Sequence, residues 1–254
     1  MLRKSLIIVI IFISAIGGST AQTPPNIEAI QAISSDPFSP YYFKTLFVRY
    51  EAADTTLTEK EYEFLYYGFP ETEGYKPLMP SPYTDSLESI LSRRSDPSKR
   101  NMETAESYAR KVLELHPFSI RDINVLAFAL SSQGDKLEAA KQMHKIKMII
   151  ATIKNSGTGL TQKTPLYVIM NDTPEDYTAF LGLRATRSMI VTSSIVFLQI
   201  ENLPNKKNKG LYFNISEIYK RKPTYLKDYK RKRKMELNPR YNPNSELNVL
   251  PSKK

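Results

Sequence analysis

Carboxylate side chains gather at three places in this chain, and enzymes use carboxylate pairs to hydrolyse glycosidic bonds. The three groups are Glu59, Glu61 and Glu63; Glu71 and Glu73; and Asp172, Glu175 and Asp176. Glycoside hydrolysis needs two such groups about 5 to 10 Å apart across a sugar. The first and third groups also stand at expected helix starts, where the helix dipole favours negative charge. Helix capping therefore competes with catalysis as their explanation, and we favour capping.

The other residue types that commonly carry catalysis offer few combinations. The chain has two histidines, His116 and His144, and no cysteine. His116 stands beside Pro117, where a cation would interact with the last carbonyls of a helix, and His144 borders an expected packing face. The sequence contains no Gly-x-Ser-x-Gly, Ser-x-x-Lys, His-Glu-x-x-His, calcium loop, phosphate-binding loop or dinucleotide fingerprint. We therefore predict no catalytic residues, no metal site and no cofactor.

Aromatic side chains offer a second kind of binding surface. Residues 69–85 hold four prolines and one glycine, which predicts an irregular connection. The connection is too long for a simple turn, so it is either a mobile linker or a loop packed down by its apolar side chains, and we favour the packed loop. Tyr75 and Tyr83 are its candidate binding residues. The tyrosine pairs at 41–42 and 66–67 have helical spacing, so we expect them in the core rather than against a sugar or a base.

The strongest charge signal is a basic segment at the end of the chain. From residue 206 to 254 there are 15 Lys or Arg against four Asp or Glu, whereas residues 22–205 hold 19 basic and 22 acidic residues. A basic run attracts polyanions in a salt-dependent way. The alternative is a disordered end that only aids solubility, which the Pro and Asn residues after 234 favour. The candidate binding residues are Lys220, Arg221, Lys222, Lys230, Arg231, Lys232, Arg233 and Lys234.

The first 21 residues have the pattern of an export signal. Arg3 and Lys4 are followed by an apolar run over residues 6–16, broken by Ser14, and by Ser-Thr-Ala before the cleavage point. We predict cleavage after Ala21 and a periplasmic or secreted protein. The eleven-residue run is short of the roughly 20 residues of a retained transmembrane anchor, and a chain without cysteine cannot carry a lipid anchor at the cleavage site.

Location decides which polyanion the basic segment would meet. In the cytoplasm nucleic acid would be the first candidate partner. Outside it, the available anions are lipid headgroups, lipopolysaccharide phosphates and acidic polysaccharides. We therefore expect an anionic envelope surface as partner and disfavour nucleic acid. Finding residues 1–21 on a soluble cytoplasmic form would restore nucleic acid as the partner.

Apolar spacing predicts helices through most of residues 26–155. Residues 41–50 carry apolar and aromatic side chains three and four apart, and Thr58 with Glu61 forms a capping box that begins a helix ending at Gly68.

Three more helices are expected between 103 and 155, separated at Pro117 and Gly134. Asp135 caps the third, whose apolar face begins at Leu137 and Ala140. These helices resemble a tetratricopeptide repeat in the residues Leu115-His116-Pro117, Leu126-Ala127 and Ala139. The match covers about one and a half repeats, whereas solenoids usually need three or more. The resemblance implies a helical hairpin packed on its neighbours, with a protein partner through the helical region.

After Gly159 the pattern changes from helical to strand-like. Residues 166–170, 189–201 and 211–216 are β-branched or alternating runs, the second long enough for a hairpin turning at 193–194, and a helix over 173–182 follows the first. We predict an α+β fold with a mainly helical N-terminal part, including the tetratricopeptide-like hairpin. A small antiparallel or mixed sheet of three to four strands follows.

The predicted organisation has four parts. They are a signal peptide over 1–21; a helical region over 22–155, with paired helices over 26–68, a Pro/Tyr-rich loop and linker over 69–100 and tetratricopeptide-like helices over 103–155; a small α/β region over 156–219 packed on the helices; and a basic, disordered tail over 220–254.

The order of motifs also resembles an uncharacterised family of exported bacterial proteins, described as a domain of unknown function. The resemblance rests on Ser39-Pro40-Tyr41-Tyr42, Asp54-Thr55-Thr56-Leu57-Thr58, Glu61-Tyr62, Leu65-Tyr66-Tyr67-Gly68, Gly157-x-Gly159-Leu160-Thr161 and Lys209-Gly210-Leu211-Tyr212-Phe213-Asn214-Ile215-Ser216. It spans residues 26–219 and implies no activity, because the family has no assigned catalytic residues. The long basic extension after Tyr219 departs from the family pattern.

Two functions fit these observations. We favour a non-enzymatic interaction module at the cell envelope, whose basic tail contacts anionic surfaces. The alternative is an envelope polysaccharide or peptidoglycan hydrolase, which needs a concave pocket where two of the clustered carboxylates converge with tyrosines. Dispersal of these carboxylates on a convex surface would remove the hydrolase.

Overall fold

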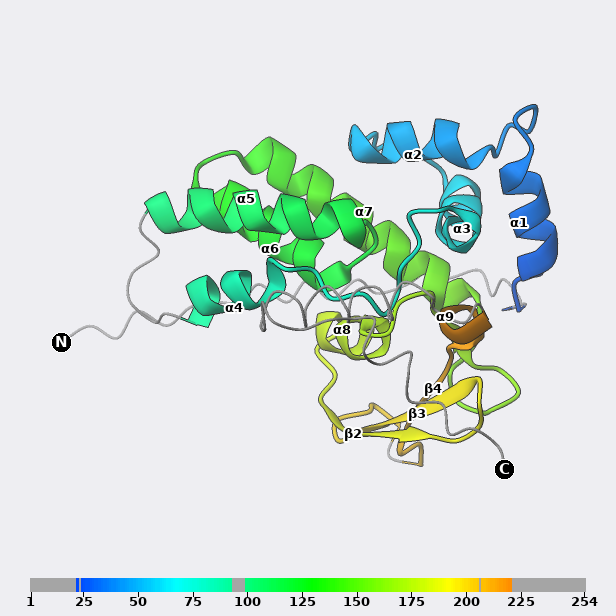
Figure 1. The fold of residues 1–254 in the computed structure, drawn as a ribbon. Coiled ribbons are helices and arrows are strands. Elements are labelled where there is room, and N and C mark those ends of the chain that lie inside the picture. Colours follow the sequence, from blue (N-terminus) through cyan, green and yellow to red (C-terminus); the bar gives the residue numbers. More distant parts are fainter. Residues whose placement is uncertain (1–21, 23, 93–98, 206, 221–254) are drawn as a thin grey trace, which may run out of the picture.

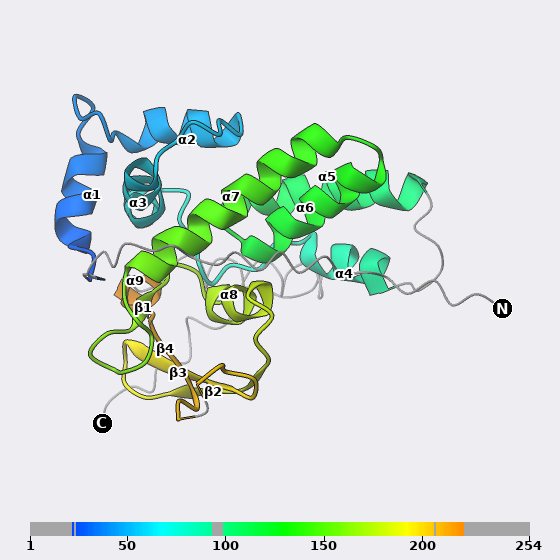
Figure 2. The same ribbon diagram turned by 180° about the vertical axis from the view of Figure 1, so that it is seen from behind.

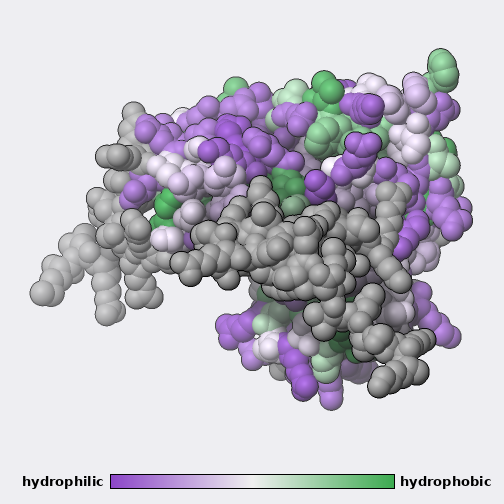
Figure 3. Space-filling model, in the orientation of Figure 1, coloured by the Kyte–Doolittle hydropathy of each residue, from purple (hydrophilic) through white to green (hydrophobic). Residues whose placement is uncertain are grey.

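The computed structural model describes residues 22, 24–92, 99–205 and 207–220, and every structural statement below concerns these residues. The predicted export signal over 1–21 and the basic residues from Arg221 onward lie outside them. No helix in the described part is long and apolar enough to cross a membrane. The face seen in Figure 3 is mostly hydrophilic, with hydrophobic residues scattered among the polar ones.

Three helices form the N-terminal layer: α1 (Ile27–Ser35), α2 (Phe43–Glu51) and α3 (Glu59–Gly68). Helices α1 and α2 both pack on α3, which lies between them and α7 (Figure 1). Leu46 and Tyr50 are the buried residues of α2, as the spacing of 41–50 predicts. The predicted capping box is also confirmed, since Thr58 accepts from the backbone N–H of Glu61 while Glu61 accepts from that of Thr58.

The tyrosine pair in α3 belongs to the core, as predicted. Tyr66 and Tyr67 are buried, and their hydroxyls reach β1 and the segment that follows it. Tyr67 donates to the carbonyl of Tyr167 at 3.3 Å, and Tyr66 accepts from the N–H of Ile169 at 3.4 Å. The pair therefore ties the helical layer to the α/β part.

The stretch expected as loop and linker over 69–100 contains secondary structure. A short 3₁₀ helix, η1 (Phe69–Glu71), comes first, and α4 (Thr84–Ser92) follows the prolines. Helix α4 was not predicted, because few apolar residues mark its packing face. Leu87 is buried, and Ile90 is half-buried against the apolar residues of α5 and α6. Packing against α5 supplies the stability that the local pattern does not indicate.

The three predicted central helices are α5 (Lys99–Leu115), α6 (Ile120–Ser132) and α7 (Lys136–Asn155), of which α5 begins four residues earlier than expected. In Figure 2, α7 runs diagonally in front of α5 and α6, from their end of the molecule toward the sheet. The predicted start of its apolar face is wrong, since Leu137 is 69% exposed and Ala140 is exposed. Ala139 is buried instead, because a small residue is needed where α7 crosses close to α6.

The α/β part holds β1 (Leu166–Tyr167), α8 (Thr173–Phe180), β2 (Ala185–Ile190), β3 (Ile195–Ile200), β4 (Gly210–Asn214) and α9 (Ser216–Lys220). The sheet order is β1-β4-β3-β2, with β1 parallel to β4 and the other pairs antiparallel. The predicted α+β fold is confirmed, and of the predicted alternatives for the sheet the structure has the mixed one with four strands. Of the predicted strand over 166–170, two residues form β1, because the tyrosine hydroxyls of α3 and of the loop bond the backbone of Ile169.

The core has two parts. The larger cluster joins α1, α2 and α3 to α7 and the sheet, and the smaller one lies between α4, α5 and α6. Leu113 contacts both clusters, so the two parts are continuous.

Candidate functional site

A cavity of about 1030 Å³ opens where five segments of the chain meet. They are the loop over 76–82, α4, the end of α5, the start of α6 and the segment over 170–176 that begins α8. Helices α4 and α8 lie on the same side of α6 (Figure 1). The charged and polar side chains that line the cavity are Lys76, Ser81, Thr84, Asp85, Glu88, His116, Ser119, Arg121, Asp122, Asn171, Asp172, Thr173 and Asp176.

A fixed turn between α5 and α6 positions one wall of the cavity. Phe118 is fully buried, with its ring 5.0 Å from that of Tyr50 and 5.3 Å from that of Phe69, centroid to centroid. Ser119 follows as the N-cap of α6, accepting from the backbone N–H of Asp122 at 3.3 Å and donating to its carboxylate at 2.6 Å. The aromatic anchor and the cap together hold the first turn of α6 against the cavity.

An ion pair joins α6 to α8 beside the cavity. The guanidinium of Arg121 lies 2.9 to 3.0 Å from Oδ1 of Asp176, and the backbone N–H of Arg121 reaches Oδ2 at 3.4 Å. The Asp176 side chain is 7% exposed, so burial raises its pKa to about 6 while Arg121 acts in the opposite direction. The carboxylate is therefore ionised at neutral pH.

Two further carboxylates on the cavity wall, Asp122 and Asp172, form no ion pair with a residue that the structure describes, although both interact electrostatically with Arg121. Burial raises the pKa of Asp122, whose hydrogen bonds come from Ser119. Asp172 is the N-cap residue of α8, yet its side chain makes no capping hydrogen bond and instead accepts from Asn171 at 3.2 Å. Capping, our preferred explanation for this group, is therefore wrong for Asp172.

His116 is held as a neutral side chain at the same wall. Its Nε2 donates to the carbonyl of Met79 at 2.7 Å, and burial lowers its pKa. We expected His116 to interact as a cation with the last carbonyls of α5, but its ring instead bonds the loop at Met79. Nδ1 is buried without a hydrogen-bond partner. Although Ser119 and Asp122 are close in sequence, the serine proton points to the aspartate and not to the histidine, so these residues do not form a catalytic triad.

The cavity brings together some of the clustered carboxylates and separates the others. Asp172 and Asp176 line it, whereas Glu61, Glu71 and Glu73 do not. The described residues that line it include five acidic side chains against two basic ones, a balance of minus three, and no tyrosine. Sequence reasoning missed Asp85, Glu88, Ser119, Arg121 and Asp122. The Ser-x-x-Asp spacing after Pro117 is typical of a helix start, and a helix was expected there, but this spacing does not indicate which distant segments lie against it.

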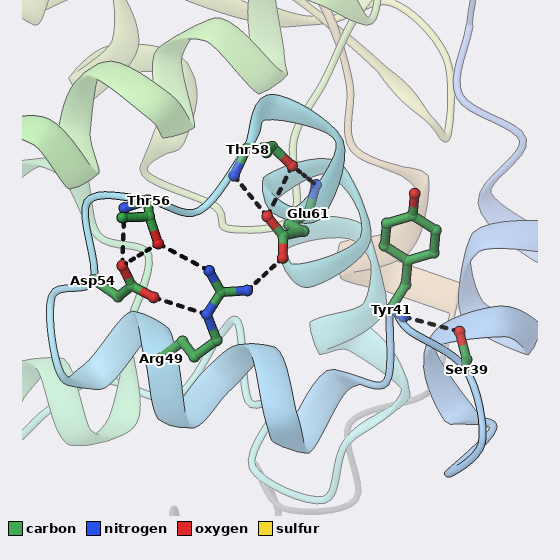
Figure 4. A network of polar contacts seen from close by, with 7 residues as sticks. All are labelled: Ser39, Tyr41, Arg49, Asp54, Thr56, Thr58 and Glu61. Carbon is green, nitrogen blue, oxygen red and sulfur yellow. Dashed lines mark hydrogen bonds and ion pairs between the residues drawn. The ribbon is translucent and has the colours of Figure 1, made fainter.

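A second polar network surrounds Arg49 and explains one of the sequence motifs (Figure 4). Arg49 forms ion pairs with Asp54, at 2.8 Å, and with Glu61, and donates to Thr56 at 3.2 Å. Hydrogen bonds from Thr56, followed by that from Arg49, lower the pKa of Asp54 to about 2. Bonds from Thr58 and Arg49 lower the pKa of Glu61, although partial burial acts against them. The motif over 54–61 thus has a structural role, because its side chains bind Arg49 of α2 and hold α2 against α3.

The predicted binding residues that the structure describes are engaged with the fold. Lys220 lies 3.5 Å from Glu217 and donates to the side chain of Gln31 at 3.1 Å, which links α9 to α1. Tyr75 donates to the carbonyl of Ile169 at 2.7 Å. Tyr83 stacks on the ring of a tyrosine in α5 at 5.7 Å. These two tyrosines hold both ends of the loop whose middle lines the cavity.

The remaining predicted basic residues lie outside the described part of the chain; they are Arg221, Lys222, Lys230, Arg231, Lys232, Arg233 and Lys234. Within that part, no group of three or more metal-ligating side chains is arranged to hold a metal ion.

Comparison with known proteins places the chain in a family without a defined activity. No significant match was found among curated proteins or among solved structures. The model of one protein family matches residues 28–224, most of the chain and all of the folded part from α2 to α9. The chain therefore belongs to the family described as a domain of unknown function, DUF4919.

Proposed function

We propose that this protein is an exported, non-enzymatic interaction module of the cell envelope. Its cavity binds a cationic group of a partner, and its basic segment contacts anionic surfaces. The observation that carries the proposal is the acidic cavity at the junction of α4, α5, α6 and α8. Asp172 is central to it, because this carboxylate lines the cavity and its side chain does not cap α8.

The polar groups of the cavity suit binding better than covalent catalysis. The Ser119 hydroxyl donates to a carboxylate, and the His116 nitrogen that could act as a base is enclosed in the protein. A general base needs a route to the proton that it removes. Fixed carboxylates without a nearby nucleophile instead favour attraction of a cation.

Export and surface contact rest on the sequence at the two ends of the chain. The pattern over residues 1–21 supports export, and the five consecutive basic residues over 230–234 support contact with anions. Lys220 already links α9 to α1, so we assign surface contact to the basic residues that follow it.

Binding of a lysine tripeptide tests the cavity. We expect the full mature chain to bind the tripeptide, measured by titration calorimetry at low salt, and the variant Asp172→Asn to bind it more weakly. Glu73→Gln is the matched control, because Glu73 is an exposed carboxylate outside the cavity. Equal affinity of wild type and Asp172→Asn, or equal losses in both variants, would refute the assignment.

Vesicle binding tests the basic segment separately. Vesicles with phosphatidylglycerol should bind the wild type more strongly than a variant with glutamine at all five positions over 230–234. Each basic residue near an anionic membrane contributes about 1 kcal/mol. Vesicles of phosphatidylcholine are the control for non-electrostatic adsorption. Unchanged sedimentation of the glutamine variant with anionic vesicles would rule out this role.

One observation favours the hydrolase as a second candidate. Asp176, with its pKa raised by burial to about 6, shares the cavity with Asp122 and Asp172. A carboxyl group that holds its proton near this pH is typical of a general acid. If the protein is a hydrolase, it should release soluble fragments from purified peptidoglycan, and both Asp176→Asn and Asp122→Asn should abolish release. The proposed binding role predicts no release by any of the three proteins.

A further inference from the structure

We infer that the outer edge of β2 binds an extended segment of a partner protein that carries acidic and apolar side chains. The segment adds to the sheet as one more strand beside β2. No residue of β2 lines the cavity, so the inference does not depend on the role proposed for the cavity.

The two edges of the sheet differ in how their backbone groups are satisfied. At the β1 edge, the N–H of Tyr167 donates to the side chain of Ser156 at 2.8 Å, and its carbonyl accepts from Tyr67 at 3.3 Å. β2 forms the other edge, and no strand of the described chain pairs with its outer side (Figure 1). An edge strand with free N–H and C=O groups is a template for pairing with another chain. The β2 edge is therefore the open side of this sheet.

The pairing with β3 fixes which backbone groups of β2 face outward. Val191 donates its N–H to the carbonyl of Ile195 at 2.8 Å, and the same register continues along the strand to Arg187. In an antiparallel ladder, pairs that exchange hydrogen bonds alternate with pairs that do not. Counted back from Val191, Ser188 and Ile190 therefore turn their N–H and C=O groups away from β3. They offer two donors and two acceptors to an added strand.

The side chains of β2 add apolar surface and positive charge to this edge. Ile190 is 80% exposed and Val191 is 38% exposed. The Arg187 side chain is exposed and forms no ion pair with a residue that the structure describes. Arg187 and Met189 project from the same face of the strand, because alternate residues share a face. An added strand thus meets a cation and, two residues further on, apolar side chains.

The charge of the surrounding residues identifies the chemistry of the partner. Between residues 183 and 215 the described chain has one acidic residue and four basic ones, which are Arg184, Arg187, Lys207 and Lys209. The acidic residue, Glu201, lies 3.2 Å from Arg184 and is already paired. A second copy of the chain would bring the same positive charge to the edge, which is unfavourable. A partner strand with a carboxylate opposite Arg187 and apolar residues beside it fits the charge and the apolar surface together.

Binding of a synthetic strand to the full mature chain tests the inference. The probe is a fluorescein-labelled, end-capped hexapeptide, Thr-Val-Val-Thr-Glu-Thr, whose affinity is measured by fluorescence polarisation. In antiparallel register it sets its glutamate opposite Arg187 and its valines opposite Met189 and Ile190. No binding to wild type would overturn the inference and leave the proposed role of the cavity intact.

Ser188→Pro tests the outward backbone groups. Proline is tolerated on an edge strand, and here it removes the outward N–H without removing a bond to β3. The variant should keep its circular dichroism spectrum and bind the peptide about tenfold more weakly. Unchanged affinity would place the peptide elsewhere on the chain and overturn the inference. Concentration-dependent dimers of wild type that Ser188→Pro removes would assign the edge to a second copy instead.

Methylation of the peptide tests strand pairing without any change to the protein. Two peptides carry methyl groups on the amide nitrogens of one or the other set of alternate residues. Only one set donates to β2, so methylation of that set should weaken binding far more than methylation of the other set. Equal effects of the two methylated peptides would rule out pairing as a strand.

A charge exchange tests the role of Arg187. Arg187→Glu should bind the peptide about fivefold more weakly, and a peptide with lysine in place of its glutamate should restore the affinity for this variant. Lys209→Glu is the matched control, because it makes the same change of charge at an exposed residue outside β2. Failure of the exchanged peptide to restore binding, or an equal loss in Lys209→Glu, would overturn the assignment of an acidic partner.

Discussion

Replacement of Asp176 by asparagine should change how the stability of the protein depends on pH. Burial raises the pKa of Asp176 from 3.8 to about 6. The folded protein therefore binds this proton more tightly than the unfolded chain, and the resulting stability is present at low pH and is lost as pH rises through about 6. Integrated from about pH 4 to pH 7, the loss is about 2 kcal/mol.

The measurement is urea unfolding of wild type and Asp176→Asn, followed by far-ultraviolet circular dichroism across this range. Other titrating groups are common to both proteins, so the difference in unfolding free energy isolates Asp176. It should favour wild type by about 2 kcal/mol more near pH 4 than at pH 7. At pH 7 the loss of the ion pair should cost little, because the Arg121 side chain is 51% exposed and stays hydrated.

Asp54→Asn is the matched control, since Thr56 and Arg49 lower the pKa of Asp54 to about 2. The stability due to Asp54 is lost as pH falls, which is the opposite direction. A flat difference for Asp176→Asn, or one that favours wild type more at pH 7, would show that the ion pair outweighs burial.

Three further substitutions have outcomes that follow from the structure. Gly210→Ala should lower the free energy of unfolding by about 3 kcal/mol in chemical unfolding, because the added Cβ would lie 2.1 Å from a carbonyl oxygen of β3. Gly74→Ala is the control: its added Cβ would meet no atom closer than 3.8 Å, so the free energy of unfolding should hardly change. Thr58→Ala should lower the unfolding free energy by about 1 kcal/mol through loss of the α3 cap, while the exposed Thr55→Ala leaves it unchanged; equal effects would refute the cap assignment. Lys145→Met should raise thermal stability at pH 7, because burial lowers the lysine pKa to about 8, and the gain should shrink toward about pH 10; a loss at pH 7 would contradict this reasoning.

The fold was largely predictable because short sequence motifs mark many of its helix boundaries. The side chains of Thr58 and Asp135 each accept a hydrogen bond from the backbone N–H three residues further along the chain. Both partners of each cap therefore stand in one short stretch of sequence. Helix α4 and the start of the α7 face have no such signal. Which side of α7 is buried depends on how closely α6 approaches Ala139, and this distance is set by tertiary packing.

The candidate site was not predictable as a unit. Met79, His116 and Asp172 belong to three separate segments, and only the packing of the loop, α5 and α8 brings them to one cavity. The clustering of acidic residues in the sequence indicated part of the cavity wall, because Asp172 and Asp176 stand at one helix start. Asp122 stands in the first turn of α6, and its position opposite α8 is a property of the fold.

The pairing of β1 with β4 makes the fold depend on contacts between distant parts of the chain. Leu166 pairs with Phe213, and Gln31 in α1 donates to Glu217 at 2.8 Å, a separation of 186 residues. Both contacts join residues that are far apart in the chain, and a large share of such non-local contacts slows folding. During synthesis the first helix and the first strand must wait for the last strand and helix to emerge. Proteolytic removal of the chain from residue 210 onward would leave β1 without its neighbour and α1 without its carboxylate partner.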